Sequence, residues 1–122
     1  MDTTTALTII GGILMVLGIA KVIFPKQFNQ NIMGDLHAEA VNPAAAIRVA
    51  LGGAILVSGI VALMCRNMPV EAASSLLMAM GIGFIVVMAS VASNKFRGFS
   101  NNIPMPPMVI FTVLIVVAFS AA

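Results

Sequence analysis

Residues 42–65 read NPAAAIRVALGGAILVSGIVALMC, and this stretch decides the fold. Asn42 is a favourable N-cap, and a proline such as Pro43 is well tolerated at the first position of a helix. Arg48 is the only charged residue in the stretch. About 20 apolar residues are needed for a helix to cross a hydrocarbon core of roughly 30 Å. The stretch therefore predicts a membrane-spanning helix over residues 43–65.

Three further apolar runs predict spans at approximately residues 5–24, 70–91 and 106–122. Hydrophobic residues make up 61% of the chain and charged residues 8%, whereas a soluble domain carries about 25% charged residues. We therefore expect an all-α integral membrane protein. It would form a single domain over residues 1–122, a bundle of four transmembrane helices whose longest connection is the loop 25–42.

A cleaved signal peptide is the alternative interpretation of the first run. Such a peptide has a positively charged region before its apolar segment and a small-residue cleavage site after it. Asp2 is the only charge ahead of the run, and Lys21 and Lys26 follow it. We therefore expect the first run to be retained as a span.

The basic residues predict the orientation. Cytoplasmic connections of membrane proteins are enriched in Lys and Arg. Arg66 is the only basic residue of the second connection. The other five belong to the first and third connections or their flanks: Lys21, Lys26, Arg48, Lys95 and Arg97. We expect the first and third loops in the cytoplasm and both termini outside, in a bacterial inner membrane or its equivalent.

Small residues predict how the helices pack. Helix association in lipid depends on close van der Waals contact, so small residues mark the interfaces. The candidates recur at spacings of four or seven residues: Gly11, Gly18, Ala46, Ala50, Ala54, Ser58, Ala79 and Gly83. They predict a compact bundle and indicate no particular function.

Arg48 is the strongest candidate for a site. An ionisable residue within a span is costly and is usually paired or placed in a polar cavity. Helical spacing puts Gly52 and Gly59 on the same face, which leaves room beside the guanidinium. Arg48 could extend to the interface, form an ion pair with Asp35 or Glu39, or bind an anionic ligand or lipid.

The loop 25–42 contains Asp35, His37 and Glu39. In an extended strand the three side chains would share a face, as a ligand set for a divalent metal. In a helix Asp35 and Glu39 share a face and His37 points elsewhere. The apolar residues of the loop favour a short amphipathic helix on the membrane, so we expect no metal and no other cofactor.

Several functions require residues that the spans lack. Asp2, Asp35, Glu39 and Glu71 all lie at span ends or in loops. Small multidrug transporters share this length and layout but rely on a glutamate inside the first helix, so the similarity to them stops at size. One His and one Cys cannot supply a catalytic triad. We expect neither an enzyme nor a nucleic-acid-binding protein.

The first 65 residues resemble small four-helix bacterial membrane proteins of the DoxX-like kind. The features that carry the resemblance are a glycine-rich first helix, a proline after it and one motif: Gly11, Gly12, Gly18, Pro25 and NPAAAIRVALGG at residues 42–53. Some DoxX-like proteins are linked to redox or quinone-associated complexes. The resemblance implies Arg48, Gly52 and Gly53 as candidate functional positions.

Two classes of function remain. The chain could be a non-catalytic accessory subunit of a larger membrane complex, of the energy-transducing or oxidase kind, with other membrane subunits and lipids as partners. It could instead be a small homo-oligomeric transporter or channel that uses Arg48 to attract an anion. A quinone- or pigment-associated redox helper is a third interpretation.

Overall fold

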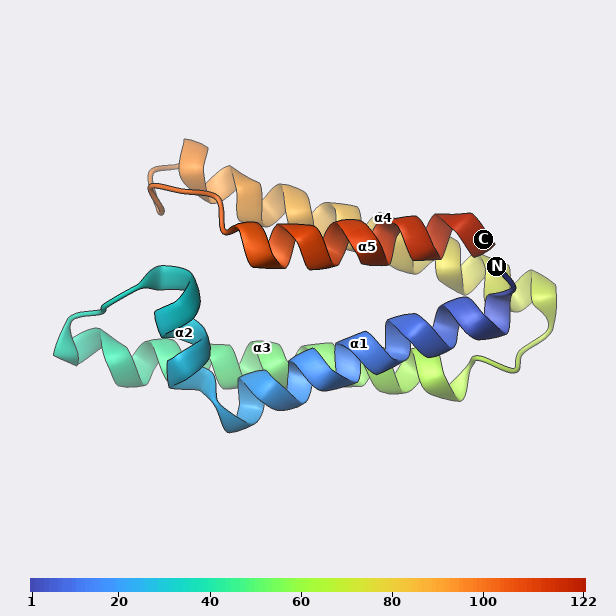
Figure 1. The fold of residues 1–122 in the computed structure, drawn as a ribbon, viewed down its shortest axis with the longest axis horizontal. Helices are drawn as coiled ribbons and strands as arrows, with labels where there is room; N and C mark the ends of the chain where they lie inside the picture. Colours follow the sequence, from blue (N-terminus) through green and yellow to red (C-terminus); the bar gives the residue numbers. More distant parts are fainter. The chain divides into compact units, whose positions relative to one another are not determined.

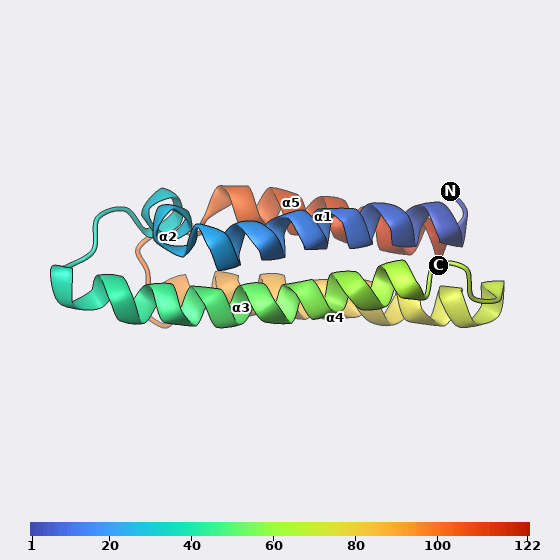
Figure 2. The ribbon, with the colours of Figure 1, turned by 90° about the horizontal axis from the view of Figure 1, so that it is seen from below.

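The computed structural model describes all of residues 1–122 and contains five helices and no strand (Figures 1 and 2). In chain order they are α1 Thr3–Ile23, α2 Pro25–Met33, α3 Ala38–Met64, α4 Val70–Phe96 and α5 Met105–Ala121. The all-α prediction is confirmed.

Three of the helices, α1, α3 and α4, are long and apolar enough to cross a membrane. The protein therefore has the helices of a membrane protein. The run predicted as a fourth span corresponds to α5, which has 17 residues. At 1.5 Å per residue α5 is about 26 Å long, slightly short of a hydrocarbon core.

The predicted starts and ends differ from the structure mainly at α3 and α4. Helix α3 begins at Ala38, so Pro43 lies inside it and not at its first position. Because proline lacks an N–H, Pro43 cannot donate to the carbonyl of Glu39, and the helix lacks that one hydrogen bond. Helix α4 continues beyond residue 91 to Phe96 and includes Lys95.

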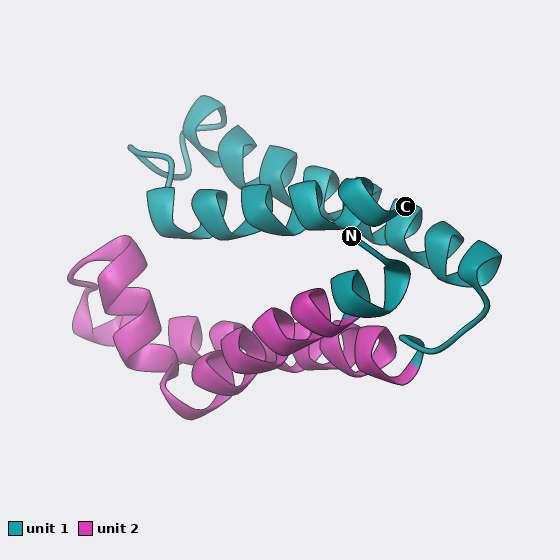
Figure 3. Ribbon diagram, turned by 45° about the vertical axis from the view of Figure 1, so that its right-hand side comes forward, with its two compact units in different colours: residues 1–7, 65–122 teal, residues 8–64 magenta.

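The chain forms two compact units, which are described separately (Figure 3). The first contains residues 1–7 and 65–122, and the second contains residues 8–64. In the second unit, α1 and α3 meet through glycines. A Cβ atom on Gly11 would lie 3.1 Å from the carbonyl oxygen of Gly59, and one on Gly18 would lie 2.9 Å from that of Gly52.

These two glycine pairs define an antiparallel seam, because both helices place their glycines seven residues apart. Seven residues are close to two helical turns, so each pair falls on one face of its helix. The backbones come together where side chains are absent, which is how helices associate in lipid. The predicted packing role of Gly11 and Gly18 corresponds to this seam.

The other predicted packing residues lie elsewhere. On α3 the residues Ala46, Ala50, Ala54 and Ser58 are exposed, and on α4 Ala79 and Gly83 are exposed as well. The buried face of α3 instead contains Ala45, Gly52 and Gly59, which are seven residues apart, and Ala62. Two ridges of small residues therefore follow α3, and only the heptad ridge packs within the second unit.

In the first unit α4 and α5 form an antiparallel hairpin. Gly81 lies beneath the ring of Phe119, whose Cζ would be 2.8 Å from an added Cβ. The rings of Phe84 and Phe111 pack at a tilt, with centroids 5.9 Å apart. Leu77 and Leu114 are fully buried. Apolar side chains, and not close backbones, fill most of this contact.

Gly98 ends α4. Its φ of +78° lies in the left-handed region that favours glycine. The N–H of Gly98 donates to the carbonyl of Lys95, and that of Phe99 donates to Asn94. This pair of bonds is a Schellman motif.

Candidate functional site

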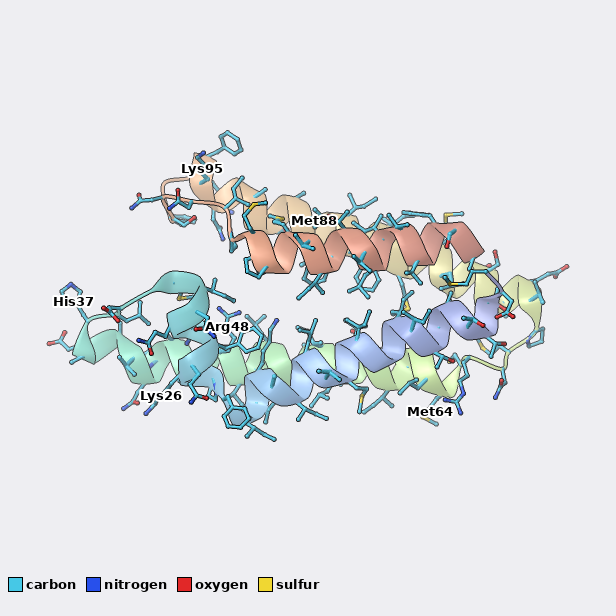
Figure 4. The ribbon with its side chains drawn as sticks, in the orientation of Figure 1. Lys26, His37, Arg48, Met64, Met88 and Lys95 are labelled. Carbon is cyan, nitrogen blue, oxygen red and sulfur yellow. The ribbon has the colours of Figure 1, made fainter.

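Arg48 reaches from α3 to α2 (Figure 4). Its Nε donates a 2.7 Å hydrogen bond to Oδ1 of Asn29. The guanidinium is half-buried. Arg48 therefore does not simply extend into solvent, and its principal partner is an amide and not a carboxylate.

Asn29 is the most buried polar residue of α2, with 2% of its surface exposed. Because Arg48 can only donate, the amide must present its oxygen to Arg48. The nitrogen Nδ2 then points away from that bond, and it is buried with no hydrogen-bond partner. Burial of an unpaired donor destabilises the fold by roughly 1–3 kcal/mol. A hydrogen-bond acceptor near this nitrogen would remove that cost.

The ring of Phe28 lies close to two cations. Nζ of Lys21 is 5.5 Å from the centroid of the Phe28 ring, and Cζ of Arg48 is 5.9 Å from it. Cation–π attraction operates at such distances. This one ring thus contacts positive groups from both α1 and α3. Lys21, Phe28 and Arg48 are called the basic cluster below.

No carboxylate neutralises the basic cluster. Arg48 forms no ion pair with Asp35 or Glu39, the two partners considered from the sequence. Asp35 instead accepts a 3.4 Å hydrogen bond from Nε2 of Gln30, and Glu39 is exposed in the first turn of α3. The cluster keeps an excess of positive charge.

A pocket of about 300 Å³ opens beside the basic cluster. It is formed by α2, the segment that follows it and the start of α3, and its lining residues are Lys26, Asn29, Gln30, Gly34, Asp35, Leu36 and Val41. Asn29 belongs both to this wall and to the bond with Arg48. The pocket therefore adjoins Arg48 through the Asn29 side chain, while Lys21, Phe28 and Arg48 lie outside its wall.

Glycines shape both parts of the site. Gly34 ends α2 with a φ of +76°, and its N–H donates to the carbonyl of Gln30. Gly52 allows α1 to approach, since an added Cβ would lie 2.8 Å from the Cβ of Lys21. The space expected beside Arg48 at Gly52 and Gly59 is thus occupied by α1 and not by a ligand.

The metal set considered from the sequence is not assembled. Asp35 and His37 lie in the segment between α2 and α3, and Glu39 lies on α3. No three His, Cys, Asp or Glu side chains of the chain are grouped so that they could hold a metal ion.

Sequence reasoning did not select Asn29 as the partner of Arg48. The pattern of α2 contains the necessary information, because Pro25, Phe28, Asn29 and Ile32 follow the 3–4 spacing of a buried helical face. A polar residue in such a face is expected to hydrogen-bond. The short amphipathic helix favoured for this loop corresponds to α2.

No family model, curated protein or solved structure matches this chain. The resemblance to DoxX-like proteins therefore stays a prediction from the motif residues, and the site is interpreted from its own chemistry.

Proposed function

We propose that the chain is a non-catalytic accessory subunit of a larger membrane complex, of the energy-transducing or oxidase kind. The observation that carries the proposal is the exposed ridge of Ala46, Ala50, Ala54 and Ser58 on α3. Small residues let helices approach closely in lipid. This ridge makes no such contact within its unit, and we assign it to a helix of another subunit.

Helix α4 offers a second surface of the same kind. Ala79 and Gly83 are exposed, and a Cβ on Gly83 would meet nothing within 4 Å. Two serines on this helix satisfy their hydroxyls locally: Ser90 donates to the carbonyl of Val86 at 2.8 Å, and Ser93 donates to that of Ser90 at 2.7 Å. Such a surface suits apolar packing better than polar catalysis.

The proposal includes a four-span topology in which α5 is the fourth span and both termini lie outside the cytoplasm. Its support is the unequal distribution of basic residues between alternate connections. A reporter fused after Ala122 tests this topology. We expect activity from a reporter that works outside the cytoplasm, and activity from a cytoplasmic reporter would contradict the orientation.

Purification in mild detergent tests the subunit role. We expect the chain to co-migrate with larger membrane subunits. Ala50→Phe and Ala54→Phe should release it, because a bulky ring prevents close approach of a partner helix. Ile60→Phe is the matched control, since Ile60 is 44% exposed on the same helix but outside the ridge. A small homo-oligomer that moves an anion across liposomes would contradict the subunit role and favour transport.

A further inference from the structure

The half-buried positive charge of the basic cluster has no counter-ion within the chain. Lys21 and Arg48 share the Phe28 ring, and Arg48 meets only the neutral oxygen of Asn29. Lys26 adds a third cation at the wall of the pocket. Half-buried cations are stabilised by an anion or by several acceptors. A negative group from outside the chain would therefore stabilise the basic cluster.

The unpaired Nδ2 of Asn29 is an independent indication of a ligand. It is a buried donor in a side chain that also lines the pocket. Its orientation is set by Arg48, which occupies the amide oxygen. A ligand that meets Asn29 must therefore bring an acceptor, and Lys26 in the pocket wall favours an acceptor with negative charge.

We propose that the pocket and the basic cluster bind the phosphate of an anionic lipid headgroup. Phosphate oxygens accept several charge-assisted hydrogen bonds at once, which suits Asn29 and Lys26 in the pocket wall, with the positive charge of Arg48 bonded to Asn29. Lys21 lies in the last turn of α1, a helix long enough to cross the membrane, where headgroups are expected. This location favours a lipid over free phosphate as the source.

Asp35 is the one carboxylate in the pocket wall, held by Gln30 at 3.4 Å. Its charge opposes a phosphate, and it limits affinity for highly charged anions. Asp35→Asn keeps the shape and removes the charge. Phosphate binding should therefore become tighter in this variant by several-fold.

The test uses the full chain in detergent, supplemented with phosphatidylglycerol or phosphatidylcholine, with retained lipid measured by native mass spectrometry. We expect preferential retention of phosphatidylglycerol. Asn29→Asp should lower retention at least about tenfold, since it replaces the free donor by a carboxylate but still accepts from Arg48. Lys95→Gln on α4 is the control for loss of one positive charge and should leave retention unchanged.

Equal retention of the two lipids, or equal retention by Asn29→Asp and the unaltered chain, would overturn the proposal. A loss in Lys95→Gln as large as that in Asn29→Asp would overturn it as well, because the effect would then be one of overall charge. Inorganic phosphate provides the second arm. Saturable binding of inorganic phosphate without selective lipid retention would contradict the lipid as the source.

Discussion

Gly18 of α1 and Gly52 of α3 lie so close that a Cβ on Gly18 would stand 2.9 Å from the carbonyl oxygen of Gly52. This oxygen is backbone, which cannot move aside as the nearby Leu56 side chain, 2.7 Å from the same Cβ position, can. The two glycines therefore set the distance between the helices. Lys21 follows Gly18 by three residues, and Arg48 precedes Gly52 by four. The two glycines therefore also determine how Lys21 lies relative to Arg48.

Gly52→Ala should destabilise the second unit by about 1–3 kcal/mol, the usual cost of overpacking. The added methyl would lie 2.8 Å from the Cβ of Lys21 and 3.0 Å from the carbonyl oxygen of Gly18. Gly53→Ala is the matched control, because a Cβ there meets nothing within 4 Å. Denaturant titration of the purified chain measures both. Equal stability of the two variants would show that the seam is not closely packed.

Gly81→Ala on α4 should cost less than Gly52→Ala. Here the obstructing atom is the far end of the Phe119 side chain, at 2.8 Å, and Phe119 is 36% exposed. The ring can swing outward with little loss. Combining Gly81→Ala with Phe119→Leu should recover most of the loss in the same titration. A loss at Gly81 that Phe119→Leu does not reduce would contradict this explanation.

The bond between Arg48 and Asn29 should appear as coupling in a double-mutant cycle. Arg48→Gln, Asn29→Ala and the double variant give the interaction free energy, which we expect to be about 0.5–3 kcal/mol. A second cycle that combines Arg48→Gln with Lys26→Gln is the control, since no contact joins these two side chains. Strict additivity for Arg48 and Asn29 would mean that their hydrogen bond contributes nothing to stability.

The start of α1 should fray in acid. The backbone N–H of Thr5 donates to Oδ1 of Asp2 at 2.7 Å, and this bond holds the pKa of the Asp2 carboxyl below its ordinary 3.8. A lowered pKa means that the cap stabilises the helix above pH 3.8 and is lost as the pH falls through the lowered value. Hydrogen exchange at the Thr5 amide measures the loss. Asp2→Asn should remove the pH dependence, and an unchanged profile in that variant would contradict the assignment to Asp2.

Run length and composition predicted the helices, because an apolar run of about 20 residues has few alternatives to a membrane-length helix. The start of α3 was not predicted, because proline is favoured at the first position of a helix, whereas Pro43 lies in the second turn, where it removes a backbone hydrogen bond. The residues before it continue the helix to Ala38. Local preference alone therefore predicts the later start.

The choice between the two small-residue ridges of α3 depends on its neighbour. The ridge at spacing four and the ridge at spacing seven are both small enough for close approach. Gly11 and Gly18 on α1 are seven residues apart, and they match Gly52 and Gly59. The packed ridge is therefore a property of two helices, and a single-helix pattern does not reveal it. The pattern of α2 marks Asn29 as a buried polar residue, but it does not identify Arg48 as its partner, which comes from another helix.

The ridge that remains exposed provides the most direct test of the accessory-subunit proposal. A photo-activated crosslinking residue at position 54, with position 60 as the control on the same helix, is activated in the native membrane. The account predicts a crosslink from position 54 to a larger membrane protein and a much weaker one from position 60. Crosslinks from position 54 only to lipid, or only to a second copy of this chain, would contradict it.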